Sequence, residues 1–85
     1  MKILHVLRNP DDRLAAEVAR QQGEGCSIAF LLIQDGVLAR PDVPGAMIYV
    51  LAQDLEARGV KGTGETVDYN GAVRLIAEHD KVIVW

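Results

Sequence analysis

The longest uninterrupted apolar run, residues 28–33, constrains the fold of this 85-residue chain more than any other feature. Ser27 precedes the run and Gln34-Asp35-Gly36 breaks it, so the run has the length of one strand. No position in the run is polar, which requires that both faces of the strand are covered. We therefore predict a central strand of a largely parallel sheet. The run is far too short to span a membrane.

Shorter patterns on either side predict the remaining elements. Further strands are expected at residues 3–7, 46–51, 66–68 and 81–85. Helices are expected after Asn9, over 54–58 and over 69–77, with one helical turn at 37–39. Strand and helix alternate throughout, which implies crossover connections and an α/β fold with an open, mostly parallel sheet of about five strands.

The expected helix ends follow from capping residues. Asn9 is predicted to cap the first helix, with Pro10 at its first position, and Gly23 and Gly25 to end it. Gly59 is predicted to stop the short middle helix.

The two longer helices each have an apolar stripe. In the first, the stripe comprises Leu14, Ala15, Val18 and Ala19. The last helix, capped by Asp68, has the most regular stripe in the sequence, at i, i+3, i+4, i+7 and i+8: Tyr69, Ala72, Val73, Ile76 and Ala77.

Composition narrows the class of protein. A chain this short buries roughly 60–65% of its unfolded surface, so burying a further face against a partner would add stability. The net charge is −3 and the basic residues are scattered, which disfavours direct binding to nucleic acid. One cysteine rules out an internal disulfide and fits a reducing compartment. The first residues do not resemble a signal peptide, so we expect a cytoplasmic protein.

Polar residues follow the predicted strands where an open parallel sheet binds ligands. Gln34, Asp35 and Gly36 follow the second strand, and Asp54 follows the third. This edge is acidic, with Arg8 as its one clear cation. The carboxylates of Asp35 and Asp54 are in a position to meet there, but loop acids of this kind more often form caps and turns, which is the role we expect.

Cys26 is the candidate nucleophile, but its position is unfavourable. It precedes the second strand, and at roughly 3.3 Å per residue that strand separates it from Asp35 by about 25 Å. Its neighbours Glu24 and Gly25 provide no positive charge to stabilise a thiolate. We predict a structural thiol and no catalytic residue in this chain.

Two histidines and the terminal tryptophan complete the set of candidates. His5 lies within an apolar strand and is expected to be a hydrogen-bonded core residue, and His79 to close a helix. Neither forms a metal-ligand spacing with Cys26, and Gly59–Gly64 lacks the spacing of a phosphate loop, so no metal or cofactor is predicted. Trp85 either anchors the last strand in the core or packs on another subunit.

Several segments in order resemble one protein family. The segments ILH, LLIQDGV, YVLAQDLEARGV and VDYNGAVRL, with the final Trp, resemble the DsrH/TusB branch of the DsrE/DsrF/DsrH sulfur-relay proteins. The resemblance implies one small, three-layer, flavodoxin-like domain over residues 1–85. It also implies partners of the TusC/DsrF and TusD/DsrE types and a role in wobble-uridine 2-thiolation of tRNA or in sulfur oxidation.

The resemblance places the persulfide-carrying cysteine on the TusD-type subunit. Some DsrH proteins have a cysteine in the first helix, but residues 14–22 contain none here, and Cys26 cannot be equated with it. We therefore expect a non-catalytic subunit of a sulfur-relay complex. The candidates for an interface or for the rim of a partner's site are His5, Gln34, Asp35, Gly36, Asp54, Arg58, Tyr69 and Trp85.

Two alternatives remain open at this point. The first is an autonomous sulfurtransferase that uses Cys26. The second is a homo-oligomeric module that binds a small ligand at the acidic edge of the sheet. A shared fold does not separate these functions.

Overall fold

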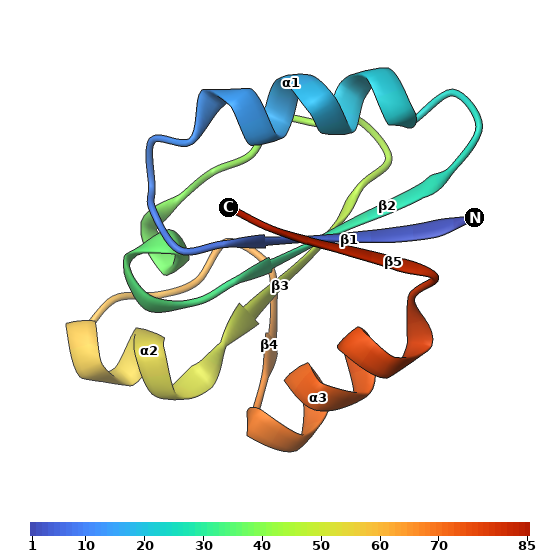
Figure 1. The fold of residues 1–85 in the computed structure, drawn as a ribbon. Coiled ribbons are helices and arrows are strands. Elements are labelled where there is room, and N and C mark those ends of the chain that lie inside the picture. The colour runs from blue at the N-terminus through green and yellow to red at the C-terminus, as the bar shows by residue number, and fades with distance from the viewer.

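The computed structural model describes residues 1–85 and contains five strands, three α-helices and one 3₁₀ helix (Figure 1). In chain order the elements are β1 (Lys2–Leu7), α1 (Arg13–Gln22), β2 (Ser27–Leu32), η1 (Gln34–Leu38), β3 (Met47–Leu51), α2 (Ala52–Arg58), β4 (Glu65–Val67), α3 (Tyr69–Glu78) and β5 (Lys81–Val84).

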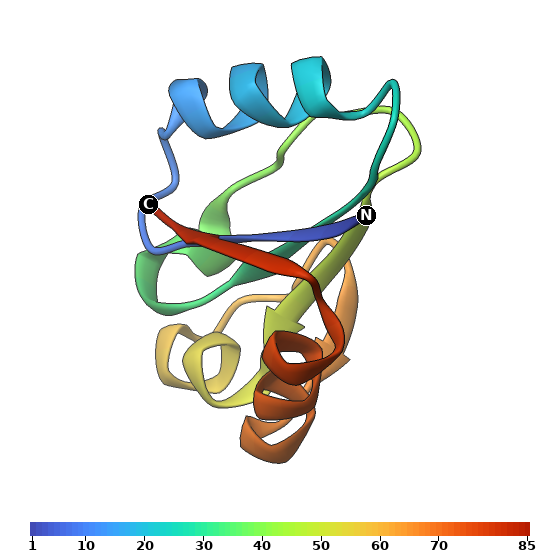
Figure 2. The ribbon, with the colours of Figure 1, turned by 45° about the vertical axis from the view of Figure 1, so that its right-hand side comes forward.

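The five strands form one open sheet in the order β4-β3-β2-β1-β5, and every neighbouring pair is parallel. Strand β2 lies at the centre, and β4 and β5 form the two edges. Helix α1 lies on one face of the sheet and α3 lies on the other (Figure 2). Helix α2 packs on the α1 side, because its buried Leu55 belongs to the same hydrophobic cluster as Ala15 and Ala19 of α1. The predicted α/β fold with a three-layer arrangement is confirmed.

Strand β2 connects two hydrophobic clusters because its side chains alternate between the faces of the sheet. Phe30 and Leu32 belong to the cluster on the α1 face. Ala29 and Leu31 belong to the cluster on the α3 face. All four are at most 4% exposed, so the prediction that both faces of this strand are covered is confirmed.

The start of the first helix differs from the sequence-based prediction. Asn9 and Pro10 lie in a turn, and α1 begins at Arg13. Asp12 is the N-cap, because its carboxylate accepts the backbone N–H of Ala15. The prediction of Asn9 as the cap is therefore wrong. Three residues later in the chain, an aspartate offers the same type of acceptor.

The apolar stripe of each long helix is only partly buried. In α1, Ala15 and Ala19 are buried, whereas Leu14 is 63% exposed. Small alanines at the contact allow a close approach of α1 to the sheet. Residues on the flank of the stripe then remain in solvent.

Helix α3 shows the same effect more strongly. Its cap is confirmed, since Asp68 accepts the N–H of Gly71, but its buried residues are Ala72 and Leu75. Tyr69, Val73 and Ile76 are exposed by 68%, 58% and 46%. The side of α3 that packs on the sheet is therefore centred on Ala72 and Leu75, to one side of the predicted stripe.

The segment after β2 forms η1, which begins at Gln34 and not at residue 37 as predicted. Two backbone hydrogen bonds hold it: the N–H of Ile33 donates to the carbonyl of Leu7 (3.0 Å), and the N–H of Gly36 donates to Ile33 (2.8 Å). A Cβ atom at Gly36 would overlap the carbonyl oxygen of Leu7. Glycine is therefore required where this turn lies against the end of β1.

We predict that Gly36→Ala lowers the free energy of unfolding by at least about 2 kcal/mol, because the turn must move away from β1. Gly25→Ala is the matched control, since a Cβ at Gly25 meets no atom within 4 Å and should change stability little. Chemical denaturation monitored by circular dichroism measures both. Equal stability of the two variants would contradict the close contact.

Candidate functional site

Three of the predicted rim residues form one ion-pair cluster beside the carboxyl ends of β2 and β3. Arg58 Nε donates to Asp35 Oδ1 at 2.9 Å, and Arg58 Nη1 lies 3.7 Å from Asp54 Oδ1. We call these residues the Asp35–Asp54–Arg58 cluster. Asp35 and Asp54 both lie at this edge, and the guanidinium of Arg58 contacts both.

Local structure explains why these residues meet. Asp54 lies in the first turn of α2, and Arg58 follows it by one helical turn, at i+4. The other oxygen of Asp54, Oδ2, accepts the backbone N–H of Gln34 at 2.6 Å. Gln34 has a φ of 53°, a left-handed conformation that costs about 1 kcal/mol in a residue other than glycine. The carboxylate of Asp54 thus fixes the backbone of η1.

The cluster presents a neutralised and partly exposed polar surface. The side chains of Asp35, Asp54 and Arg58 are 65%, 24% and 28% exposed. Exposed ion pairs stabilise a fold by only about 0–1 kcal/mol. The three ion-pairing side chains therefore contribute little to stability, although their contacts hold them in one geometry.

Remote from this cluster, His5 and Trp85 form a hydrogen-bonded pair inside the α1 face. His5 is 0% exposed. The indole Nε1–H of Trp85 donates to His5 Nδ1 at 2.9 Å, and His5 Nε2 lies 2.7 Å from Gln22 Oε1. Since Nδ1 accepts and Gln22 Oε1 can only accept, the imidazole is neutral with its proton on Nε2. Its ring also stacks on Phe30, with 5.4 Å between centroids.

These contacts decide between the two roles considered for Trp85. It packs against the hydrophobic cluster under α1, its backbone N–H donates to Val6 at 2.9 Å, and Arg8 Nε donates to its carbonyl oxygen at 2.6 Å. Trp85 thus anchors the end of the chain on the core. His5 has no accessible surface, so it lies behind Trp85 and not on a rim, as a satisfied core histidine.

The thiol lies at the other edge of the sheet. Cys26 immediately precedes β2, whereas Gln34 follows it, and Cys26 is half-buried against the hydrophobic cluster under α1. No ion pair or side-chain hydrogen bond involves Cys26 or its neighbours Glu24 and Gly25. His79, at the end of α3, donates from Nδ1 to the carbonyl of Leu75 at 2.6 Å, which confirms its place in the helix cap.

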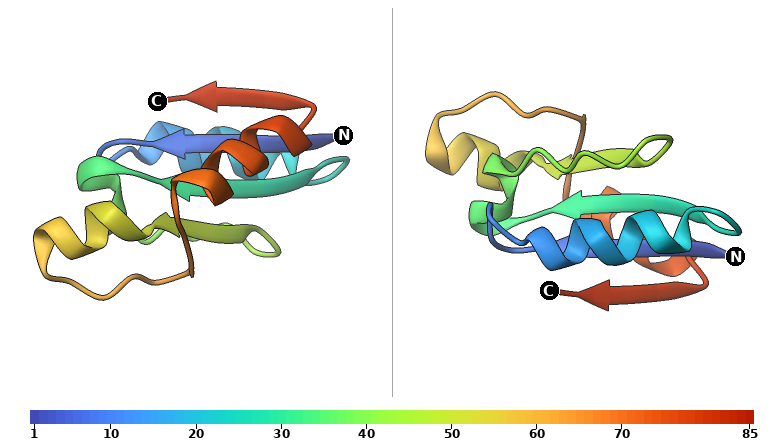
Figure 3. Two further views of the ribbon diagram at one scale, coloured as in Figure 1. Left: turned by 90° about the horizontal axis from the view of Figure 1, so that it is seen from below. Right: turned by 90° about the horizontal axis from the view of Figure 1, so that it is seen from above.

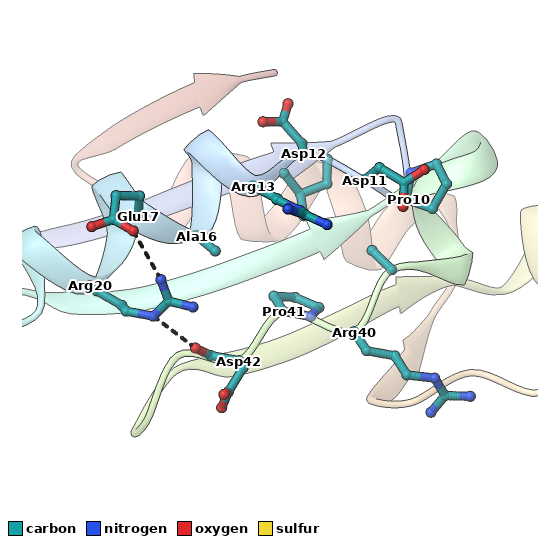
Figure 4. Close-up of a pocket in the computed structure, with 12 residues that line it drawn as sticks. Pro10, Asp11, Asp12, Arg13, Ala16, Glu17, Arg20, Arg40, Pro41 and Asp42 are labelled. Carbon is teal, nitrogen blue, oxygen red and sulfur yellow. Dashed lines mark hydrogen bonds and ion pairs between the residues drawn. The ribbon is translucent and has the colours of Figure 1, made fainter.

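Sequence reasoning missed a cleft of about 420 Å³ between α1 and the segment after η1 (Figure 4). Arg13 extends into this cleft, whereas Arg40 extends away from it (Figure 4). Arg20 pairs with Glu17 at 3.3 Å and donates from Nε to the carbonyl of Asp42 at 3.1 Å. The sequence did offer one signal for this cleft: Arg13 and Arg20 are seven positions apart and so lie on one face of the helix. The lining holds more acids than arginines, so the cleft has no excess positive charge for an anion.

A protein-family model described as "DsrH like protein" matches residues 13–82. The chain belongs to the DsrH-like family. It is therefore a member of a sulfur-relay family, as the resemblance of its sequence segments implied. The match includes the Asp35–Asp54–Arg58 cluster and all three helices, and it begins after the β1 strand that contains His5.

The fold of this DsrH-like chain is similar to a solved structure, the solution NMR structure of protein Tm0979 from Thermotoga maritima. The TM-score is 0.63 and the sequence identity is 22%, with 91% of this chain and 92% of that chain covered. The similarity concerns the fold alone. Among curated proteins, none matches this DsrH-like chain. Its helices are all too short or too polar to cross a membrane.

The His5–Trp85 pair generates a prediction for the pH dependence of this DsrH-like chain. Burial lowers the pKa of His5 below its ordinary value of 6.5, although the hydrogen bond to Gln22 opposes this shift. The unfolded chain therefore binds the proton more readily. The contribution of His5 to stability is complete above pH 6.5 and is lost as the pH falls through the lowered pKa of the folded state.

Urea unfolding followed by Trp85 fluorescence, from about pH 7.5 to about pH 5, measures this effect. The free energy of unfolding should fall with pH in the wild type and in the control His79→Asn. In His5→Phe, the part of the fall that belongs to His5 should be absent. The same slope in His5→Phe as in the wild type would contradict a buried neutral imidazole.

Proposed function

We propose that this chain is a non-catalytic subunit of a sulfur-relay complex of the TusBCD/DsrEFH type, in the cytoplasm. In this proposal residues 1–85 form a single DsrH/TusB-like domain. Its partners are subunits of the TusC/DsrF and TusD/DsrE types, and the TusD-type subunit carries the persulfide. The complex passes that sulfur toward 2-thiolation of the wobble uridine of tRNA.

The position of Cys26 carries this proposal. It is the single cysteine of the sequence, and it lies at the amino edge of the sheet beside the hydrophobic cluster under α1. A thiol that accepts and donates sulfur needs an accessible thiolate, stabilised by a nearby cation, a base or a helix N-terminus. Cys26 has neither an ion-pair partner nor a hydrogen-bond partner. A persulfide on a neighbouring subunit accounts for the family role without this thiol.

The Asp35–Asp54–Arg58 cluster supports the second half of the proposal, a contact with partners. It lies at the edge where parallel sheets bind their ligands, and the hydrogen bond from Gln34 to Asp54 already fixes its backbone. Binding a partner there requires little further ordering of the chain, which favours affinity. The net charge of −3 and the scattered basic residues leave tRNA contacts to other subunits.

Co-purification with TusC-like and TusD-like partners tests the assignment of the cluster. We predict that Arg58→Ala weakens binding roughly tenfold, or about 1.4 kcal/mol, because Asp35 and Asp54 lose their shared cation. Arg74→Ala is the matched control, an exposed arginine on α3 in no ion pair. If the wild-type chain retains neither partner, the proposed function fails. If both variants bind equally well, partners bind elsewhere.

Sulfur transfer by the reconstituted complex separates this proposal from a Cys26-dependent sulfurtransferase. We predict that Cys26→Ser transfers sulfur to tRNA at a rate within about twofold of the wild type, because no sulfur passes through this residue. Cys26→Ala serves as a control for the serine hydroxyl. A loss of transfer in both variants, with the complex intact, would establish Cys26 as a sulfur carrier.

A further inference from the structure

The cleft between α1 and the segment after η1 has walls that the fold itself holds in place. The helix and this segment run side by side across the same face of the sheet (Figure 3). The two buried residues of the lining, Leu7 and Ala39, belong to the hydrophobic cluster under α1. Arg20 joins the two walls, because it donates to the carbonyl of Asp42 at 3.1 Å. The cleft, which we call the α1 cleft, is therefore formed without a ligand.

Other residues of the lining limit how far the α1 cleft can collapse. Pro10 precedes α1 and Pro41 lies on the opposite wall, and a proline ring fixes φ near about −65°. Ala16 of α1 faces the cleft, where its single methyl group leaves space open between the walls (Figure 4). Binding in a cleft of this kind orders little further chain, which favours affinity.

The α1 cleft has the place and the size of a small-molecule site. Residues 10–12 follow β1, and the opposite wall follows η1 after β2, so the cleft lies beyond the carboxyl ends of two neighbouring parallel strands. Open parallel sheets bind their ligands at this edge. The volume of about 420 Å³ lies within the range of ligand pockets, about 300–1,000 Å³. At about 30 Å³ for each water molecule, this is room for a ligand of roughly a dozen non-hydrogen atoms.

Arg13 is the unpaired polar group of this cleft. Its side chain extends into the cleft (Figure 4), and it takes part in no ion pair and no side-chain hydrogen bond. Two nearby acids are already engaged, since Asp12 caps α1 and Glu17 pairs with Arg20. The guanidinium of Arg13 is therefore available to a ligand. Its planar set of N–H donors matches a carboxylate, which it binds through two parallel hydrogen bonds.

The remaining charges of the lining determine what else this ligand carries. Asp11 and Asp42 also line the cleft, and neither carboxylate is in an ion pair. A ligand with negative charge alone is repelled by these acids, and one with positive charge alone is repelled by Arg13. We propose that the α1 cleft binds a small zwitterion of the amino-acid or dipeptide class. Its carboxylate pairs with Arg13, and its ammonium group is attracted by Asp11 and Asp42.

Titration of the ¹⁵N-labelled chain with L-alanyl-L-alanine, up to about 20 mM and followed by NMR, tests the proposal. Backbone amide signals of residues 11–16 and 39–42 should shift, with a dissociation constant on the order of 1 mM for a ligand of this size. Two blocked forms separate the charges. The C-terminal amide lacks the carboxylate and the N-acetyl form lacks the ammonium group, and each should bind about tenfold more weakly.

Variants assign each charge of the ligand to its partner. Arg13→Gln should weaken binding of the dipeptide about tenfold and abolish the difference between the dipeptide and its amide. The double variant Asp11→Asn/Asp42→Asn should abolish the difference between the dipeptide and its N-acetyl form. All three residues lie outside the hydrophobic clusters, so the fold is retained. Arg74→Gln, an exposed arginine on α3, is the matched control and should bind as the wild type does.

Three results overturn the proposal: no shift of these amides at about 20 mM dipeptide, equal binding of the blocked forms, or undiminished binding by Arg13→Gln. The titration uses this chain alone and measures binding of a small molecule. Its outcome is therefore independent of whether the chain joins a sulfur-relay complex.

Discussion

The requirement to cover β2 on both faces determines most of this structure. Its apolar side chains alternate between two hydrophobic clusters, so neither α1 nor α3 can leave the sheet without exposing one of them. The same strand positions the candidate site. Gln34 begins directly after Ile33 at its carboxyl end, and Cys26 precedes Ser27 at its amino end. One buried strand thus separates the Asp35–Asp54–Arg58 cluster, beside its carboxyl end, from the thiol of Cys26 before its amino end.

The elements of the fold were predictable from local patterns, because runs of apolar residues and capping acids act within a few positions. The cap at Asp68 and the stop at Gly59, which has a φ of 62°, are as expected. The Asn9 cap was wrong because Asp12 competes for the same role. The apolar periodicity of α3 indicated a helix, but it did not indicate which residues face the sheet, since that depends on how α3 crosses β1 and β2.

The candidate site was predictable in its residues but not in its contacts. The loops that follow parallel strands lie at the same edge of the sheet, so the sequence alone indicated that Asp35 and Asp54 lie near each other. The placement of Arg58 between them depends on the orientation of α2. The hydrogen bond from Trp85 to His5 joins residues that are 80 positions apart in the sequence. The cleft beside Arg13 depends on the path of the segment after η1. Such long-range contacts leave no local sequence pattern.

In the proposed function, the transferred sulfur never resides on this chain. Mass spectrometry of the complex, rebuilt with its TusC-like and TusD-like partners and loaded by a cysteine desulfurase with isotopically labelled sulfur, measures this directly. Our account predicts labelled persulfide on a cysteine of the TusD-like subunit and unmodified Cys26. Labelled persulfide on Cys26 that is then passed to the acceptor would contradict the account.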